Sequence, residues 1–303
     1  MKTSVVMTTY NGASFIVEML ESLKNQTRKI DEVLIFDDRS SDNTVEIIQR
    51  YIKEHNLEWE IRINLKNIGW ELNFVQALSM SNGDIIFPCD QDDIWHLDKV
   101  EKMTAAFEEN NDMWLLVSGY HAFSELGGKM VVQQKVRTEK NTKVSKVVFD
   151  EKYYQILRPG CTMAIRNGIF LRHFLELWEE GTPHDAILWI IASITGKLYL
   201  YNDTFIEYRR HDNNASKTIA HGMKYKVNEI ARTKKVNDWY ISSDYFDEDK
   251  SSVINECNIW CNYREQLIVK KRLLYWFKLY PIRKYYLTTK KYIGDLYYFI
   301  KKA

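Results

Sequence analysis

Short apolar runs alternate with amphipathic helical patterns along the first 120 residues of the chain. Residues 4–9 form an apolar run rich in β-branched side chains, and Ile16, Met19, Leu20 and Leu23 follow with the spacing of one helix face. Further strands are expected at 32–36, 59–64, 84–89 and 114–120, and further helices at 45–52, 70–80 and 97–109. This alternation predicts an α/β fold with a doubly wound, mostly parallel sheet covered by helices on both faces.

The second half of the chain is less regular. Residues 121–157 are polar and weakly periodic, which is typical of a connecting segment of mixed structure. An apolar run at 161–165, helices at 167–178 and 183–194, and strands at 198–201 and 205–208 are expected next. From about residue 222 the pattern becomes helical and then basic. We therefore predict one α/β domain over 1–221 and a helical C-terminal extension over 222–303.

The near-neutral charge of the chain hides two unequal parts. The 303 residues carry 42 Lys and Arg against 41 Asp and Glu, a net charge of +1. Residues 270–303 hold ten of the basic residues and one acid, Asp295, whereas the first 269 residues hold 32 basic and 40 acidic residues. The composition otherwise excludes disordered and fibrous classes, and it predicts an acidic body with a basic tail.

The cysteines and the apolar segments limit the cellular compartments and the kinds of metal site that are possible. Four scattered cysteines, Cys89, Cys161, Cys257 and Cys261, are too few for a disulfide framework, and no second pair or His partner supports a zinc site. The first apolar run is too short for a signal peptide, and no 18 consecutive apolar residues occur. We expect a cytoplasmic protein, with peripheral contact at the inner face of the cell membrane left open.

Polar clusters follow three of the expected strands. These clusters are Thr8-Thr9-Tyr10-Asn11, Asp37-Asp38 and Asp90-Gln91-Asp92-Asp93. Ligands of doubly wound sheets bind beyond the carboxyl ends of the strands, so the three clusters predict one site. Three carboxylates within four residues repel one another unless a cation is present, and Mg²⁺ or Mn²⁺ prefers such oxygen ligands. The alternative is a solvated acidic turn that caps the next helix.

Several nucleotide-binding and metal-binding classes are excluded by missing motifs. Only one glycine, Gly12, follows the first strand, so the dinucleotide-binding fingerprint is absent. The chain has no phosphate-binding loop of the G-x-x-x-x-G-K-[ST] type, and no glycine follows the acidic cluster as a calcium loop requires. A nucleotide in this site would therefore need a metal to neutralise its phosphates.

Taken together, these motifs resemble the family-2 inverting glycosyltransferases, which have the GT-A fold. The matching segments are Val5–Asn11, Phe36–Thr44, Asn67-Ile68-Gly69 and Asp90–Asp93, and the resemblance covers roughly residues 3–215. Arg39 departs from the family's more common Asp-Asp-Gly.

The resemblance implies a nucleotide site formed by Thr8, Thr9, Tyr10, Asn11, Asp37, Asp38, Asn67, Gly69 and Asp90. It also implies that Asp92 binds a divalent metal, Mg²⁺ or Mn²⁺. For Thr8, Tyr10, Asn67 and Gly69, a buried strand end or a simple turn is the alternative.

The second half of the chain would supply the acceptor site and the base. The resemblance implies an acceptor site at Gly160, Cys161, Thr162 and His184. The alternatives are a strand edge with small residues for the first three and a surface residue at a helix start for His184. It assigns Asp185 as the base that deprotonates the acceptor hydroxyl, although an acid at a helix start is also favoured by the helix dipole. Tyr208-Arg209-Arg210-His211-Asp212-Asn213-Asn214 is similar to a signature of bacterial capsule and O-antigen transferases, including rhamnosyltransferases. Arg209, Arg210 and His211 would then contact the diphosphate, with His211 a further metal ligand; a basic loop docked on the acidic rim is the alternative.

The implied reaction is a single inverting displacement. The expected donor is a nucleoside-diphosphate sugar, dTDP-rhamnose first and then UDP-galactose or UDP-glucose, and the expected acceptor is a saccharide carried on a lipid. Glycoside hydrolysis fits less well, because the predicted nucleotide pocket does not need water as the acceptor. A non-catalytic nucleotide-sugar-binding or scaffold protein with the same fold is the competing hypothesis.

The basic tail is also rich in aromatic residues. Ten of them lie between Tyr275 and Phe299, and Pro281 is expected to divide the segment into two helices. Basic residues with interfacial aromatics suit a helix on an anionic membrane surface, which would fit a lipid-linked acceptor. Packing on the body or across a homodimer is the alternative, and no module for nucleic acid accompanies the stretch.

Overall fold

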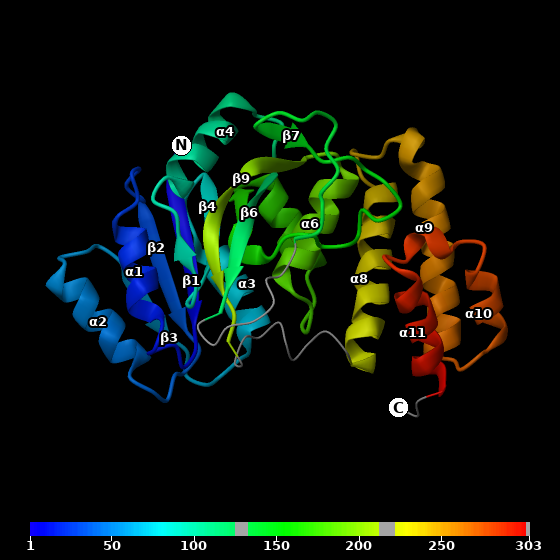
Figure 1. Ribbon diagram of the computed structural model, residues 1–303, viewed down its shortest axis with the longest axis horizontal. Coiled ribbons are helices and arrows are strands. Elements are labelled where there is room, and N and C mark those ends of the chain that lie inside the picture. The colour runs from blue at the N-terminus through cyan, green and yellow to red at the C-terminus, as the bar shows by residue number, and fades with distance from the viewer. Residues whose placement is uncertain (125–132, 212–221, 301–303) are drawn as a thin grey trace.

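A computed structural model shows an α/β domain with a helical segment packed on one side of it (Figure 1). The structure describes residues 1–124, 133–211 and 222–300. The first half alternates strands and helices: β1 (Thr3–Thr9), α1 (Ile16–Lys24), β2 (Glu32–Asp37), α2 (Thr44–Glu54), β3 (Glu60–Ile63), α3 (Trp70–Met80), β4 (Ile85–Asp90), β5 (Ile94–Trp95) and α4 (Lys99–Glu109). The predicted alternation is therefore confirmed.

The second half adds strands in both directions. It contains β6 (Leu115–Phe123), β7 (Val144–Lys146), the short 3₁₀ turn η1 (Gly160–Thr162), β8 (Met163–Arg166), α5 (Ile169–Leu177), α6 (His184–Ile194) and β9 (Leu198–Arg209). The two strands expected at 198–201 and 205–208 are one continuous strand, because β9 pairs with β6 along most of its length through register shifts near Gly119. The expectation of two separate strands was wrong at this point.

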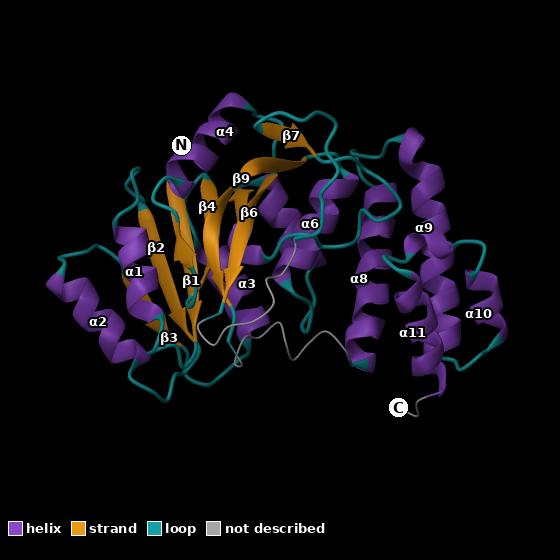
Figure 2. Cartoon of the chain, in the orientation of Figure 1, coloured by secondary structure: helices purple, strands orange, loops and turns teal. Residues whose placement is uncertain are grey.

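Within the described residues, nine strands form one sheet (Figure 2). Their order is β3-β2-β1-β4-β8-β6-β9-β5, and β7 pairs with β9. β1 is parallel to β2 and to β4, whereas β8 is antiparallel to both β4 and β6. Because β1, β2 and β4 are parallel, the three polar clusters that follow them lie at the same edge of the sheet.

Successive residues of β1 belong to different faces of the sheet. Val5 and Met7 pack with α1, α2 and α4, whereas Val6 packs with α3, α5 and α6. A strand with apolar side chains on both faces must be covered on both, which is why its sequence reads as a continuous apolar run. The expected fold class, a mostly parallel sheet with helices on both sides, is confirmed.

The C-terminal segment consists of helices that share the core of the α/β domain. These are α8 (Met223–Ile241), α9 (Glu248–Ile268), α10 (Leu274–Leu279), the 3₁₀ turn η2 (Arg283–Tyr285) and α11 (Thr289–Ile300). Helix α8 packs against α6, and Val236 and Trp260 belong to the same buried cluster as Ile190. The expected break at Pro281 is confirmed, since α10 ends just before it. The division at residue 221 stays a prediction.

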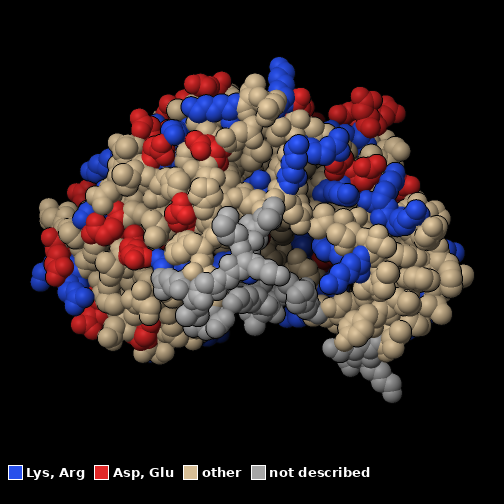
Figure 3. Space-filling view, viewed as in Figure 1, with Lys and Arg blue, Asp and Glu red and all other residues tan. Residues whose placement is uncertain are grey.

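Only part of the aromatic tail is on the surface. Tyr285, Tyr286 and Tyr292 are buried and pack around Trp260 and Trp276, as the packing alternative anticipated. Within the described ranges, we find no helix with the length and apolar character needed to cross a bilayer. Figure 3 shows Lys and Arg side chains gathered over the helical segment, at the right of the view.

Candidate active site

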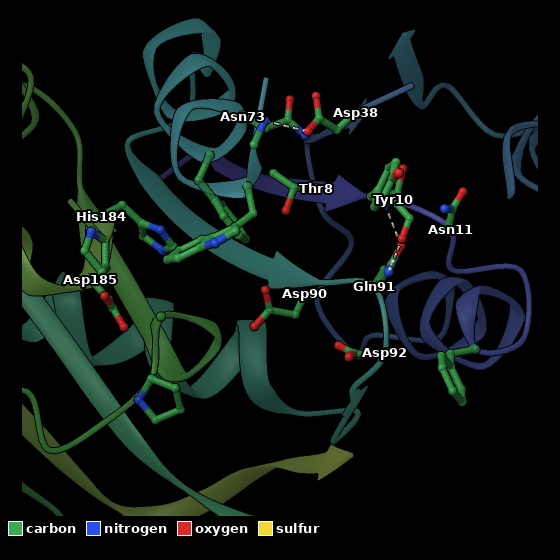
Figure 4. Close-up of a pocket in the computed structure, with 18 of the residues that line it drawn as sticks. Thr8, Tyr10, Asn11, Asp38, Asn73, Asp90, Gln91, Asp92, His184 and Asp185 are labelled. Carbon is green, nitrogen blue, oxygen red and sulfur yellow. Dashed lines mark hydrogen bonds between the residues drawn. The ribbon is translucent and has the colours of Figure 1, made fainter. Parts of the chain in front are cut away.

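A cavity of about 660 Å³ lies at the carboxyl ends of β1 and β4. Its wall combines the ends of these strands with the starts of α3 and α6 (Figure 4). The first turn of α8 contributes Tyr225. The predicted site residues in this wall are Thr8, Thr9, Tyr10, Asn11, Asp38, Asn67, Gly69, Asp90, Asp92, Gly160, His184, Asp185 and His211. Residues that are hundreds of positions apart in the sequence therefore meet around one space.

The carboxylate of Asp38 organises one side of the cavity. Its oxygens accept hydrogen bonds from the backbone N–H groups of Ile68 at 2.8 Å and Gly69 at 2.9 Å, and from the side chain of Asn64 at 2.9 Å. Asn67 in turn donates to the backbone carbonyl of Asp38. Gly69 has a φ of +87°, a value that favours glycine, and it is the N-cap residue just before α3. Asp38 thus fixes the loop that presents Asn67 and Gly69 to the cavity.

The neighbouring acid, Asp37, points away from the cavity. Its side chain accepts hydrogen bonds from the hydroxyls of Thr9 at 2.7 Å and Ser40 at 2.6 Å, and from the backbone of Ser40. It is fully buried and is not part of the cavity wall. Arg39, where the family more often has glycine, has φ of 67° and so keeps the left-handed backbone that the turn requires. Asp37 therefore holds the strand ends in place rather than facing a ligand.

The loop after β4 brings three carboxylates together. Burial and the nearby carboxylates of Asp92 and Asp185 raise the pKa of Asp90 to about 7. Burial together with Asp90 and Asp92 raises the pKa of Asp93 well above its ordinary value. Lys99 lies behind the cluster with its Nζ 2.7 Å from the carbonyl of Cys161, and burial lowers its pKa to about 8. One buried ammonium cannot neutralise three carboxylates, so a cation at the cavity surface would stabilise their ionised forms.

Asp92 and His211 form a pair that could hold such a cation. Asp92 Oδ2 lies 2.7 Å from His211 Nε2, and the two side chains are 14% and 19% exposed. The imidazole stacks on Phe15, with ring centroids 4.6 Å apart, which fixes its orientation. A carboxylate oxygen suits Mn²⁺ or Mg²⁺, and Mn²⁺ also accepts an imidazole nitrogen, so the donor set fits a divalent metal of the predicted kind. Asp212, Asn213 and Asn214 of the predicted signature lie outside the described residues.

A second group of potential ligands lies deeper in the protein. One ligand atom each from Asp90, Asp93 and Cys161 falls within 4.8 Å of the others. Burial raises the pKa of the Cys161 thiol well above its ordinary value, and a protonated thiol is a poor ligand for a hard cation. Asp90, which also faces the cavity, is the member of this group that could join Asp92 and His211.

The start of α6 forms the opposite wall of the cavity. In Figure 4, His184 and Asp185 lie across the cavity from Asp92, with Asp90 between them. Burial raises the pKa of Asp185 to about 6, and burial lowers the pKa of His184 to about 3. The His184 ring packs on Phe74, with centroids 4.2 Å apart, and a Cβ atom on Gly160 would lie 2.5 Å from its Nε2. Asp185 is therefore suited to accept a proton near neutral pH, and His184 is neutral.

Four other predicted residues do not reach the cavity. Cys161 and Thr162 are buried beneath Gly160, where the hydroxyl of Thr162 donates to the carbonyl of Pro159. Arg209 donates to the backbone carbonyl of Asp92 and pairs with Glu18, so it supports the acidic loop from behind. The backbone N–H of Arg210 donates a hydrogen bond to the carbonyl of Phe123, and Arg210 is not part of the cavity wall. Their predicted contacts with acceptor or diphosphate have no counterpart in the cavity wall.

The structure adds cavity residues that were not among the predicted site residues, although Gln91 and Tyr208 belong to the quoted motifs. These are Phe15, Trp70, Asn73, Phe74, Gln91, Ile156, Pro159, Pro183, Tyr208 and Tyr225. Gln91 exchanges two hydrogen bonds with the backbone of Tyr10, at 2.9 and 3.0 Å, and so ties the loops after β1 and β4 together. Most of the others are apolar and sit at helix starts, where a sequence pattern predicts only core packing.

Comparison with known proteins decides the family. Residues 4–175 match the family model described as "Glycosyl transferase family 2", which is more than half of the chain. The chain belongs to glycosyl transferase family 2. It is a glycosyltransferase, and its match begins with β1 and includes both the Asp38 loop and the acidic loop after β4.

Individual relatives support this assignment. The glycosyltransferase is 28% identical over 250 residues to a dTDP-rhamnosyl transferase, RfbG, of Shigella flexneri, covering 77% of this chain and 80% of the relative. It is 24% identical over 254 residues to the abequosyltransferase RfbV of Salmonella typhimurium, covering 79% and 76%. Among solved structures, S. aureus TarS 1-349 in complex with UDP-GlcNAc has a TM-score of 0.66 at 16% identity, covering 99% of this chain and 81% of that one. This last likeness establishes the GT-A fold.

Proposed function

We propose that this glycosyltransferase carries out metal-dependent, inverting transfer of a sugar from a nucleoside-diphosphate sugar to a saccharide acceptor. The observation that carries the proposal is a single cavity with the Asp92–His211 pair on one side and Asp185 on the other. dTDP-rhamnose is the first candidate donor, in view of the similarity to RfbG, and UDP-galactose and UDP-glucose are the next. The product would be a bacterial surface polysaccharide of the capsule or O-antigen type.

The two sides of the cavity divide the chemistry between them. Asp185 accepts the proton of the acceptor hydroxyl, whose oxygen attacks the anomeric carbon as the bond from that carbon to the diphosphate breaks. The electron pair leaves with the diphosphate, and attack from the opposite face inverts the configuration. A divalent cation held by Asp92 and His211, with Asp90 beside it, would neutralise the departing charge. The nucleotide would contact the residues on the other side of the cavity, which are Thr8, Tyr10, Asn11, Asp38, Asn67 and Gly69.

A thermal-shift panel tests the donor and the metal together. UDP-, GDP- and dTDP-sugars are added to the full chain with Mn²⁺ or with EDTA, and we expect one nucleotide class to raise Tm only with the metal. A ligand at about 100 times its Kd stabilises the folded state by about 2.7 kcal/mol, which is several degrees for a chain of this size. No shift with any nucleotide sugar would contradict the proposed donor class.

The acceptor is proposed to be lipid-linked, with α10 and α11 contacting an anionic membrane surface. Leu274 and Phe277 on α10 are 62% and 59% exposed, and Tyr297 and Ile300 on α11 are 59% and 72% exposed. Lys270, Lys271, Arg272, Lys278, Lys290 and Lys291 are exposed on the same helices or next to them. Exposed apolar side chains among lysines and arginines favour an interface with anionic lipids.

Sedimentation with vesicles tests this contact. The full chain is expected to sediment with phosphatidylglycerol vesicles at low salt, and F277E is expected to weaken binding by about tenfold or more, because a buried Phe contributes about 1.5–3 kcal/mol. Leu97→Glu, at a 53% exposed position on the α/β domain, is the matched control and should bind normally. Equal sedimentation of F277E and the unsubstituted chain would rule out this surface.

A further inference from the structure

A buried arginine on α8 has no ion pair with an acid among the described residues. Arg232 is 5% exposed, and its Nε and one terminal nitrogen are buried without a hydrogen-bond partner among the described residues. Its guanidinium lies 5.3 Å from the ring centroid of Tyr225, which lines the cavity. Buried arginines are normally paired, because an unpaired buried charge costs several kcal/mol.

The carboxylates on the helices around Arg232 are engaged with other cations. Glu229, three residues earlier on α8, accepts a hydrogen bond from Arg264 at 3.0 Å. Asp295 on α11 accepts from Arg264 at 2.7 Å and pairs with Lys226 at 3.3 Å. Arg264 contributes most to lowering the pKa of Glu229 and Arg232 contributes next, but no hydrogen bond or ion pair joins Arg232 to a carboxylate in the part of the chain that the structure describes.

Asp185 is the complementary group on the facing helix. Helix α8 packs against α6 (Figure 1). Asp185 lies in the first turn of α6. Asp185 Oδ1 is also buried and has no hydrogen-bond partner among the described residues. Burial raises the pKa of Asp185, and Arg232 is the main group that opposes this rise, ahead of the backbone amides of Ala186 and Gly160.

We propose that Arg232 is a positioning residue for Asp185, so that the helical C-terminal segment supplies the charge that keeps the base of the α/β domain ionised. The inference rests on the proposed function, because it gives Asp185 the role of the base. The charged or titratable groups near Asp185 are Asp90 across the cavity and His184 beside it. Those near Arg232 are Tyr225 and Glu229, and Glu229 is in turn surrounded by Arg264, Lys226 and Lys291, with Asp295 on Arg264.

The test is a double-mutant cycle that needs no ligand. Urea unfolding of the full chain is measured between pH 5 and pH 8.5 for the unsubstituted protein, D185N, R232M and the double variant. The pKa of Asp185 is about 6 in the folded chain, above the value of about 3.9 in an unfolded chain, so ionised Asp185 destabilises the fold. The stability advantage of D185N should therefore grow with pH and level off above about pH 6.

Removal of Arg232 should raise the pH at which the stability advantage of D185N stops growing. In the R232M background the pKa of Asp185 rises, so we expect the advantage of D185N to level off about one pH unit higher. R232K keeps the charge and should level off as the unsubstituted chain does. Lys235→Met removes a charge from the same helix, at a residue that is 33% exposed and paired with Glu179. It should leave the pH of the levelling-off unchanged.

An unchanged levelling-off in R232M would overturn the inference. If R232M does not fold, R232Q takes its place with the same expected shift and the same contrary result. Because unfolding requires no turnover, this failure is distinguishable from failure of the proposed function, in which D185N would retain transfer activity. In active enzyme, the acidic limb of the pH profile of kcat/KM should move in the same direction for R232M and not for K235M.

Discussion

Replacement of Asp185 by asparagine is expected to lower kcat by about 10²- to 10⁴-fold, the usual contribution of a general base. Asparagine keeps the size of the side chain at the start of α6 but cannot accept the proton of the acceptor hydroxyl. Nucleotide binding should persist, because the nucleotide residues lie on the other side of the cavity. The measurement is nucleoside-diphosphate release, together with the thermal shift produced by the same donor.

The pH dependence of the unsubstituted enzyme belongs to the same expectation. The pKa of Asp185 is raised to about 6, so the base loses its ionised form as the pH falls through that value. The kcat/KM should therefore decline below about pH 6 and level off above it. Asp244→Asn, at an exposed position on the helical segment, is the matched control and should keep full turnover. Turnover by D185N at the unsubstituted rate would remove Asp185 from the mechanism.

Replacement of Asp92 by alanine is expected to abolish the metal-dependent part of nucleotide binding and to lower kcat by about 10²- to 10³-fold. That magnitude is the cost of removing one electrostatic contact to a leaving group. The physical reason is the Asp92–His211 pair, whose oxygen and nitrogen lie 2.7 Å apart at the edge of the cavity. Thermal shifts with Mn²⁺ and with EDTA, measured on D92A and on the unsubstituted chain, give the comparison.

The partner residue provides an internal check on D92A. His211→Ala should act in the same direction, since it removes the other ligand and the ring that stacks on Phe15. D244N again serves as the carboxylate control. A metal-dependent shift of full size in D92A would show that the cation binds elsewhere, with the deeper group of Asp90 and Asp93 as the next site to test.

The fold could be predicted from sequence because its signals are local. The alternation of apolar runs and helical faces depends on neighbouring residues, and it identified β1, β2, β4 and the helices between them. The strand β9 was expected as two strands, since Asn202 and Asp203 interrupt its apolar pattern. Its continuity depends on pairing with β6, whose partners are about 80 residues away, and no local pattern carries that information.

The site could be predicted only where a motif marks it. Asp37 and Asp38 are adjacent in a matching motif, but only Asp38 reaches the cavity, because neighbouring residues at a strand end point in opposite directions. Arg209 was expected at the diphosphate and instead supports the acidic loop from behind. Trp70, Phe74 and Tyr225 were missed, since apolar residues on helices usually indicate core. Arg232 was missed because its meaning depends on the packing of α8 against α6.

The most direct test of the account is release of nucleoside diphosphate from the donor that gives the largest thermal shift, with water in place of the acceptor hydroxyl. It is measured with Mn²⁺ and with EDTA, on the unsubstituted chain, D244N and D185N. We expect release by the unsubstituted chain and by D244N only with Mn²⁺, and little or none by D185N. Release that persists in EDTA, or that D185N supports at the unsubstituted rate, would contradict it.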